Sequence, residues 1–186
     1  MHSDSGTIKF YDDQAATYAN WSKPSKPNKY LETMLQNLPN SGHVLDFGCG
    51  AGWASKAFLE AGFQVTAMDA SKGLIEQVGQ HPKLNAICAP FESLDAVAKF
   101  DGIWASYSLQ HAPRDQMPDI LARISKALKP NGVLYIGVQR GPETELLSNL
   151  VFEDCWSCGD LAWVCGFNSV FERDASDDFG EIVKAA

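Results

Sequence analysis

A glycine-rich turn between Val44 and Trp53 carries the clearest chemical signal in the chain. The segment reads VLDFGCGAGW, so an apolar run meets glycines at alternate positions, and a helix-forming segment follows. Glycines at a strand-to-helix turn allow positive φ and let a ligand approach the main chain closely. Asp46 lies just before the glycines, and its carboxylate suits a cationic or hydroxyl-bearing ligand. The turn therefore predicts a cofactor-binding loop.

A dinucleotide is the first alternative for this loop. Its fingerprint, G-x-G-x-x-G, has a third glycine that lets the helix pack closely on the strand, and the helix N-terminus holds the pyrophosphate. Trp53 stands where that third glycine would be, and an indole there would obstruct the close packing. The carboxylate of Asp46 would also repel a pyrophosphate. Both observations disfavour NAD.

The pattern D-x-G-x-G-x-G resembles motif I of class I S-adenosylmethionine-dependent methyltransferases. The resemblance implies that the loop residues Gly48, Cys49 and Gly50 wrap the methionine portion of S-adenosylmethionine. It also implies that Asp46 is linked, often through water, to the ammonium group of the cofactor. A carboxylate suits this cationic sulfonium amino acid, so the electrostatics agree with the resemblance.

A second acid, Asp69, ends the next expected strand and is followed by Ala70 and Ser71. A carboxylate at this strand end can accept hydrogen bonds from both hydroxyls of a ribose. The position resembles motif II of the methyltransferases, which implies that Asp69 and Ala70 bind the ribose end of the cofactor. NAD enzymes place an acid at the same point, so Asp69 indicates a nucleoside without choosing the cofactor. The alternative is that Asp69 is only the N-cap of the following helix.

The third expected strand leads into Ala89-Pro90-Phe91-Glu92, where many methyltransferases carry an acid that contacts the adenine amino group. Pro90 stands at that position, so this contact is expected to be missing. Phe91 is then the better adenine neighbour, through its backbone N–H and its ring, and Glu92 is a weaker candidate. A core position at a helix start is an equally good interpretation of Phe91.

The segment from Phe100 to His111, FDGIWASYSLQH, resembles motif IV of small-molecule methyltransferases and the residues that follow it. The resemblance implies that Ser106 contacts the cofactor and that His111 lies near the transferable methyl group. A neutral imidazole there can take a proton from an attacking hydroxyl, thiol or amine, so His111 is a candidate general base. The alternative is a hydrogen bond that shapes the loop before Pro113.

The N-terminal segment FYDDQAATY resembles the entry helix of the same family, whose tyrosines close over the cofactor. Tyr11 and Tyr18 are seven residues apart and share one helical face, so both are candidate cofactor contacts. A purely packing role explains this spacing equally well.

Apolar strand-like segments alternate with helical ones, which predicts right-handed crossovers and a parallel sheet covered on both faces. We expect a single α/β domain over residues 1–186, with N-terminal cap helices in 1–40 and the cofactor-binding core in 41–186. The resemblance implies a doubly wound, mostly parallel sheet of the Rossmann-like methyltransferase type, with an antiparallel last strand. The expected strands are His43–Phe47, Gln64–Asp69, Leu84–Cys88, Phe100–Ala105, Gly132–Val138, Asn168–Arg173 and Glu181–Lys184. The expected helices are Trp53–Ala61, Ser71–Gly79, Phe91–Val97, Gln116–Leu128 and Trp156–Phe167.

The composition narrows the class of partner and the cellular setting. A formal net charge of −8 disfavours a nucleic-acid groove, which needs clustered lysine and arginine. The chain has no apolar run long enough to cross a bilayer and no signal-peptide pattern, so we expect no membrane partner and a cytoplasmic location. The five cysteines form no spaced disulfide framework. Cys155, Cys158 and Cys165 lack the further ligands of a zinc site, so we expect no metal.

The sequence thus predicts an S-adenosylmethionine-dependent methyltransferase that moves a methyl group to a small-molecule acceptor by direct displacement, with S-adenosylhomocysteine as product. The residues after the fourth strand do not resemble the N-P-P-Y type motif that grips amino groups on bases or glutamine. Neither Tyr107 nor Tyr135 has a lysine four residues on, which disfavours a short-chain dehydrogenase. The alternative function is a noncatalytic cofactor-binding protein of the same fold. A monomer or a homodimer is expected.

Overall fold

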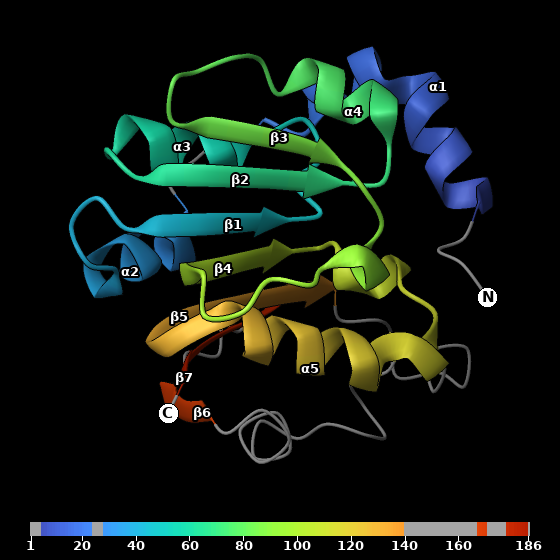
Figure 1. Ribbon diagram of the computed structural model, residues 1–186. Coiled ribbons are helices and arrows are strands. Elements are labelled where there is room, and N and C mark those ends of the chain that lie inside the picture. The colour runs from blue at the N-terminus through green and yellow to red at the C-terminus, as the bar shows by residue number, and fades with distance from the viewer. Residues whose placement is uncertain (1–4, 24–27, 140–166, 171–177, 186) are drawn as a thin grey trace.

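The computed structural model describes residues 5–23, 28–139, 167–170 and 178–185, which include a seven-stranded sheet and the helices that cover it (Figure 1). The strands are β1 (His43–Phe47), β2 (Gln64–Asp69), β3 (Leu84–Cys88), β4 (Phe100–Ser106), β5 (Leu128–Gln139), β6 (Phe167–Val170) and β7 (Asp178–Ala185). The α-helices are α1 (Ser5–Trp21), α2 (Lys29–Asn37), α3 (Trp53–Glu60), α4 (Lys72–Gln77) and α5 (Met117–Ala127). Three short 3₁₀ turns are η1 (Phe91–Ser93), η2 (Leu109–His111) and η3 (Arg114–Gln116).

The strand order β3-β2-β1-β4-β5-β7-β6 places β1 and β4 side by side. From β1 the chain moves outward to β3 and then returns to β4 on the other side of β1. Strands β1 to β5 run parallel to one another, and β7 pairs antiparallel with both β5 and β6. Because the strand order reverses between β1 and β4, a crevice forms beyond their carboxyl ends, where ligands bind in sheets of this kind.

The strands follow the alternation of apolar residues closely. The expected bounds of β1, β2 and β3 are confirmed residue for residue, and β4 extends one residue further, to Ser106. Strand β5 begins before the expected start, because the predicted turn after α5 is a bulge within it. Phe100 pairs with Leu128, whereas Gly102 pairs with Val133, so Asn131 lies in the bulge, at φ 63°.

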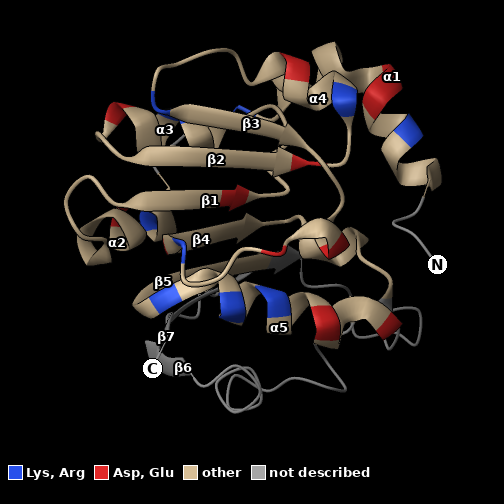
Figure 2. Cartoon of the chain, in the orientation of Figure 1, with Lys and Arg blue, Asp and Glu red and all other residues tan. Residues whose placement is uncertain are grey.

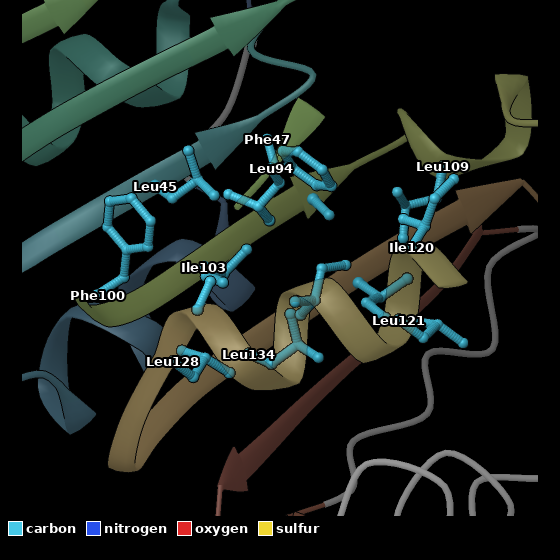
Figure 3. Close-up of a cluster of buried hydrophobic side chains, with 14 of the residues drawn as sticks. Leu45, Phe47, Leu94, Phe100, Ile103, Leu109, Ile120, Leu121, Leu128 and Leu134 are labelled. Carbon is cyan, nitrogen blue, oxygen red and sulfur yellow. The ribbon is translucent and has the colours of Figure 1, made fainter. Parts of the chain in front are cut away.

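Alternate residues of the central strands supply two apolar cores, one on each face of the sheet. On one face, Leu45 and Ile103 pack with the apolar side of α5, as Figure 3 shows. On the other face, Val44 and Trp104 pack with α2 and α3. The indole of Trp104 stacks on the ring of Tyr135 with centroids 3.9 Å apart. Helices on both faces confirm the expected doubly wound arrangement.

Three of the expected helices are confirmed to within two residues at each end, as α3, α4 and α5. The expected helix at Phe91–Val97 is wrong, because only the turn η1 forms there. At the start of this segment the Ser93 hydroxyl donates to the Pro90 carbonyl, and this local bond competes with the first backbone hydrogen bond of an α-helix. Further along, Ala98 has φ 42° and its N–H donates to the carbonyl of Lys126, so the backbone is bonded to α5 instead.

Helix α1 packs against α4 at the carboxyl end of the sheet (Figure 1). The two helices approach closely at Gly73, where an added Cβ would lie 3.0 Å from the Asp12 carbonyl oxygen and 3.1 Å from the Ala15 Cβ. None of the helices in the described part of the chain has the length and apolar character needed to span a bilayer. The expected helix Trp156–Phe167 lies outside the described residues except for Phe167, which begins β6 instead. The cysteines at 155, 158 and 165 also lie outside the described residues.

Candidate functional site

A pocket lies beyond the carboxyl ends of β1, β2 and β4, at the point where the strand order reverses. It has a volume of about 640 Å³, its open mouth included, and α1 forms one wall. Figure 2 shows acidic residues at the ends of β1 and β2, beside this region. Among the predicted site residues, the pocket is lined by Tyr11, Tyr18, Gly48, Gly50, Asp69, Ala70, Phe91, Ser106 and His111.

A second, smaller cavity shares several of these lining residues and extends toward the first turn of α3. Asp46 and Cys49, the two remaining predicted contacts, line this second cavity together with Trp53 and Trp104. All the predicted site residues therefore lie at the two neighbouring cavities. Their roles in binding stay predictions.

The glycine loop connects β1 to α3 by a tight turn whose backbone is hydrogen bonded to the end of β2. Gly48 has φ 75°, and the N–H groups of Gly48 and Cys49 both donate to the Met68 carbonyl, at 2.8 and 3.0 Å. A Cβ added at Gly48 would collide with the side chain of Ser108. Gly48 is thus required both by its backbone conformation and by the closeness of the segment after β4.

Asp46 is buried, and one carboxylate oxygen, Oδ2, is held by the start of α3. That oxygen accepts hydrogen bonds from the Ser55 N–H at 2.9 Å and from the Ser55 hydroxyl at 2.6 Å. Burial raises the pKa of Asp46 to about 7 and outweighs the two bonds from Ser55, which favour the ionised form. A cationic group in the adjoining cavity would favour the carboxylate, so Asp46 suits the ammonium end of an amino-acid ligand.

Asp69 closes the loop from the side of β2. Its Oδ2 accepts from the Gly50 N–H and its Oδ1 from the Ser71 N–H, each at 2.9 Å. Burial raises the pKa of Asp69 against these two bonds. Each oxygen keeps a second lone pair, so the carboxylate can still accept from ribose hydroxyls. The N-cap of α4 is Ser71, whose hydroxyl accepts from the Leu74 N–H, so the alternative of Asp69 as N-cap is wrong.

Phe91 and Ser106 mark two further walls of the larger pocket. The Phe91 ring packs edge-on against Phe47 with centroids 4.8 Å apart, and one side of it lines the pocket. Phe91 packs on the core and also lines the pocket, and its contact with adenine stays a prediction. Ser106, at the end of β4, lines both cavities.

His111 and the tyrosines of α1 face one another across the pocket mouth. The Tyr11 hydroxyl lies 3.3 Å from His111 Nε2, and the two rings meet edge to face with centroids 5.6 Å apart. The Tyr18 ring contacts Tyr11 in turn, at 5.2 Å. The predicted helical face shared by Tyr11 and Tyr18 is confirmed, and it is directed toward the ligand space.

Three residues that sequence reasoning missed support this site. Asp12 fixes α1, because its Oδ1 accepts from the Ser71 hydroxyl at 2.6 Å and from the Gly73 N–H at 2.9 Å. Ser108 donates to the Phe47 carbonyl at 2.7 Å and so fixes the segment before His111. Ser55 is the third, through its bonds to Asp46. Ser55 belongs to the apolar-periodic stretch of α3 and carries no sequence signal for this role.

Asp101 lies at the end of the sheet away from the pocket, and its bonds hold β1 and β5 beside β4. It accepts from the His43 N–H and from Lys129 Nζ, both at 2.8 Å. Burial opposes ionisation of Asp101, but these bonds and the charge of Lys129 outweigh it and lower the pKa. The described residues contain no cluster of three or more His, Cys, Asp or Glu side chains suited to a metal ion.

Residues 44–132 match the model of a family described as a methyltransferase domain. The chain is 34% identical over 114 residues to a ubiquinone biosynthesis O-methyltransferase from Coxiella burnetii, across 58% of this chain and 47% of that protein. It is 30% identical over 107 residues to a malonyl-[acyl-carrier protein] O-methyltransferase from Enterobacter lignolyticus, across 55% of this chain and 42% of that protein. The chain spans about half the length of these curated relatives or less.

The fold is also similar to that of 1,6-didemethyltoxoflavin-N1-methyltransferase from Burkholderia thailandensis, whose crystal structure contains S-adenosylhomocysteine and 1,6-didemethyltoxoflavin. The TM-score is 0.74 at 20% identity, and the match covers 96% of this chain and 87% of that chain. At such identity the likeness shows the fold alone. The glycine loop, the acid that ends β2 and the strand order agree with the match of residues 44–132 to the methyltransferase domain model.

Proposed function

We propose that this protein transfers a methyl group from S-adenosylmethionine to an oxygen atom of a small-molecule acceptor by direct displacement. The observation that carries the proposal is the glycine loop itself. It lies at the strand-order reversal and holds the Asp69 carboxylate against the pocket by the Gly50 N–H. The curated relatives named as O-methyltransferases support oxygen as the acceptor atom.

The residues present fit the cofactor in three places. Asp69 offers a free lone pair on each oxygen to the ribose hydroxyls, and Asp46 offers a buried carboxylate to the ammonium group. The Phe91 ring offers an apolar face to the adenine. It would take over the contact that many methyltransferases make through an acid, because Pro90 stands at the position of that acid. When bound, S-adenosylmethionine supplies an electrophilic methyl group on a sulfonium. A sulfonium suits a pocket edged by two carboxylates, whereas a pyrophosphate does not.

The protein's own contribution to such a reaction is mainly alignment. Displacement needs the acceptor oxygen in line with the methyl carbon, and a pre-aligned pair reacts much faster than the same groups in solution. His111 lines the pocket beside this space, and burial lowers its pKa, although the charge of Asp69 raises it. A neutral imidazole at pH 7 is able to take the acceptor's proton, which supports His111 as the general base.

We further propose that residues 1–186 act as one domain, with residues 1–40 as a cap, either as a monomer or as a homodimer. The docking of α1 over the pocket supports the cap. The free thiols of Cys49 and Cys88 support a reducing cytoplasmic location. The net charge of −8 supports a small molecule over nucleic acid as partner.

Methyl transfer is tested by incubating the protein with S-adenosylmethionine and a panel of phenols, alcohols, carboxylic acids and amines, and measuring S-adenosylhomocysteine. We expect turnover with hydroxyl or carboxyl acceptors and its loss in Asp69→Ala. Asp119→Ala, on the exposed side of α5, is the matched control. Turnover only with amines would contradict oxygen as the acceptor atom. Tight cofactor binding with no turnover on any acceptor would favour the noncatalytic alternative.

A further inference from the structure

Tyr11 is the residue of α1 that touches the candidate base. Its hydroxyl oxygen lies 3.3 Å from His111 Nε2, and both side chains line the larger pocket. The distance is at the long end for a hydrogen bond. Catalytic hydrogen bonds often have this length before substrate binds and shorten in the complex. The contact therefore places a phenol between the pocket space and one nitrogen of the imidazole.

The protonation states of the pair set the direction of this hydrogen bond. Burial raises the pKa of Tyr11, and the charge of Asp69 raises it further, so the phenol is neutral at pH 7. Burial lowers the pKa of His111 against the opposing effect of Asp69, so the imidazole is neutral as well. Tyr18, on the same helix as Tyr11, also faces the pair, and burial raises its pKa. A neutral phenol is a better donor than a neutral imidazole, so Tyr11 O–H donates to Nε2.

We propose that Tyr11 relays the acceptor's proton to His111, an inference that rests on the methyl transfer proposed above. The acceptor O–H gives its proton to the Tyr11 oxygen while the Tyr11 proton passes to His111 Nε2. The acceptor oxygen forms its bond to the methyl carbon as the carbon–sulfur bond breaks, and the electron pair stays on sulfur. The products are the methyl ether, neutral S-adenosylhomocysteine and a His111 imidazolium, which returns its proton to water.

Two contacts hold Tyr11 in the place that the relay requires. The next residue, Asp12, accepts from the Ser71 hydroxyl and the Gly73 N–H and so fixes this turn of α1 on α4. The Tyr18 ring also packs edge-on against the Tyr11 ring, with centroids 5.2 Å apart. Because Tyr11 belongs to α1 and His111 to η2, the relay is complete only while α1 is docked over the pocket.

The first test uses the cofactor-free protein and needs no acceptor. Nitrogen-15 NMR of the His111 ring, assigned with His111→Gln, reports which nitrogen carries the proton. We expect the proton on Nδ1 in the wild-type protein, because Nε2 accepts from Tyr11. In Tyr11→Phe we expect a shift toward the Nε2-protonated form, which an imidazole side chain in water prefers. Tyr30→Phe removes a phenol on the other face of the sheet and is the control. A wild-type His111 protonated on Nε2, or no change in Tyr11→Phe, would overturn the relay.

The second test compares rates once the acceptor panel has given a substrate. General acid–base groups contribute about 10²- to 10⁴-fold, so Tyr11→Phe and His111→Gln should each lower kcat by a factor in that range. Because both residues act on one proton, the double variant should be no slower than the slower single variant. Multiplied losses in the double variant would show independent roles and overturn the relay. A wild-type protein that binds no S-adenosylhomocysteine would instead overturn the proposed function.

Discussion

The buried carboxyl of Asp46 should make the protein less stable as the pH rises. Its pKa is about 7 in the folded protein against an ordinary value of 3.8, and burial is the main cause. In its neutral form, a buried carboxyl of this kind costs little stability. As the pH rises from about 4 to 7, the carboxyl ionises in the unfolded chain but not yet in the folded protein, so the free energy of unfolding falls. At about 1.4 kcal/mol per pKa unit, ionisation of Asp46 costs on the order of 4 kcal/mol of unfolding free energy above pH 7.

Replacement of Asp46 by asparagine removes this cost and keeps an oxygen that accepts from Ser55. We therefore expect Asp46→Asn to be more stable than the wild-type protein at pH 8, by an amount on the order of 4 kcal/mol, and nearly equal to it at pH 4. Urea unfolding between pH 4 and pH 8 measures this difference directly. Asp95→Asn, in an exposed loop, reports the effect of removing one carboxylate elsewhere. A difference between Asp46→Asn and wild type that stays constant with pH would refute the reasoning.

The same carboxyl links stability to ligand binding. An ammonium group near Asp46 favours the ionised form, so S-adenosylhomocysteine should release a proton from Asp46 when it binds at pH 6. Calorimetry in buffers of different ionisation enthalpy measures this proton. We expect its release in the wild-type protein and its loss in Asp46→Asn. Equal proton release in both proteins would place the ammonium group away from Asp46.

Three further perturbations test the packing around the site. Asp12→Asn should speed hydrogen exchange in α1 several-fold, because it weakens the bonds from Asp12 to Ser71 and Gly73. Asp13→Asn should not, since among the described residues the Asp13 carboxylate pairs only with exposed Lys9. Equal exchange in both variants would contradict the role of Asp12 in fixing α1. Gly48→Ala should lower S-adenosylhomocysteine affinity at least tenfold in calorimetry, since its Cβ would collide with Ser108, and full affinity would show that the loop tolerates a side chain. Trp104→Ala should lower the unfolding free energy by about 3–5 kcal/mol in urea, because the indole is fully buried, and a loss below 1 kcal/mol would contradict its place in the core.

Local patterns predict most of the sheet and the site's position. The strands β1, β2 and β3 could be bounded to the residue because their apolar runs end at a glycine turn, an acid or a proline. The glycine loop was recognisable because an acid followed by three glycines at alternate positions is rarely needed outside cofactor-binding turns. Asp69 ends a strand next to β1, so parallel topology alone places its carboxylate beside Gly50.

Contacts between distant segments account for what the sequence could not predict. Tyr11 and His111 are separated by 100 residues and meet only because α1 returns over the pocket. Asp12 has no local pattern that indicates its bond to Ser71 on another helix. The helix expected at Phe91–Val97 fails for a related reason, since Ala98 and the residue after it hydrogen bond to the end of α5. Tertiary bonds there override the local preference.

The most direct test of the account is calorimetric binding of S-adenosylhomocysteine, with NAD as the parallel ligand, to the wild-type protein and to Asp69→Ala. The account predicts micromolar binding of S-adenosylhomocysteine alone, and at least a tenfold loss of affinity in Asp69→Ala. Binding of NAD with no response to S-adenosylhomocysteine would contradict the assignment of the glycine loop. Full affinity in Asp69→Ala would contradict the placement of the ribose at the end of β2.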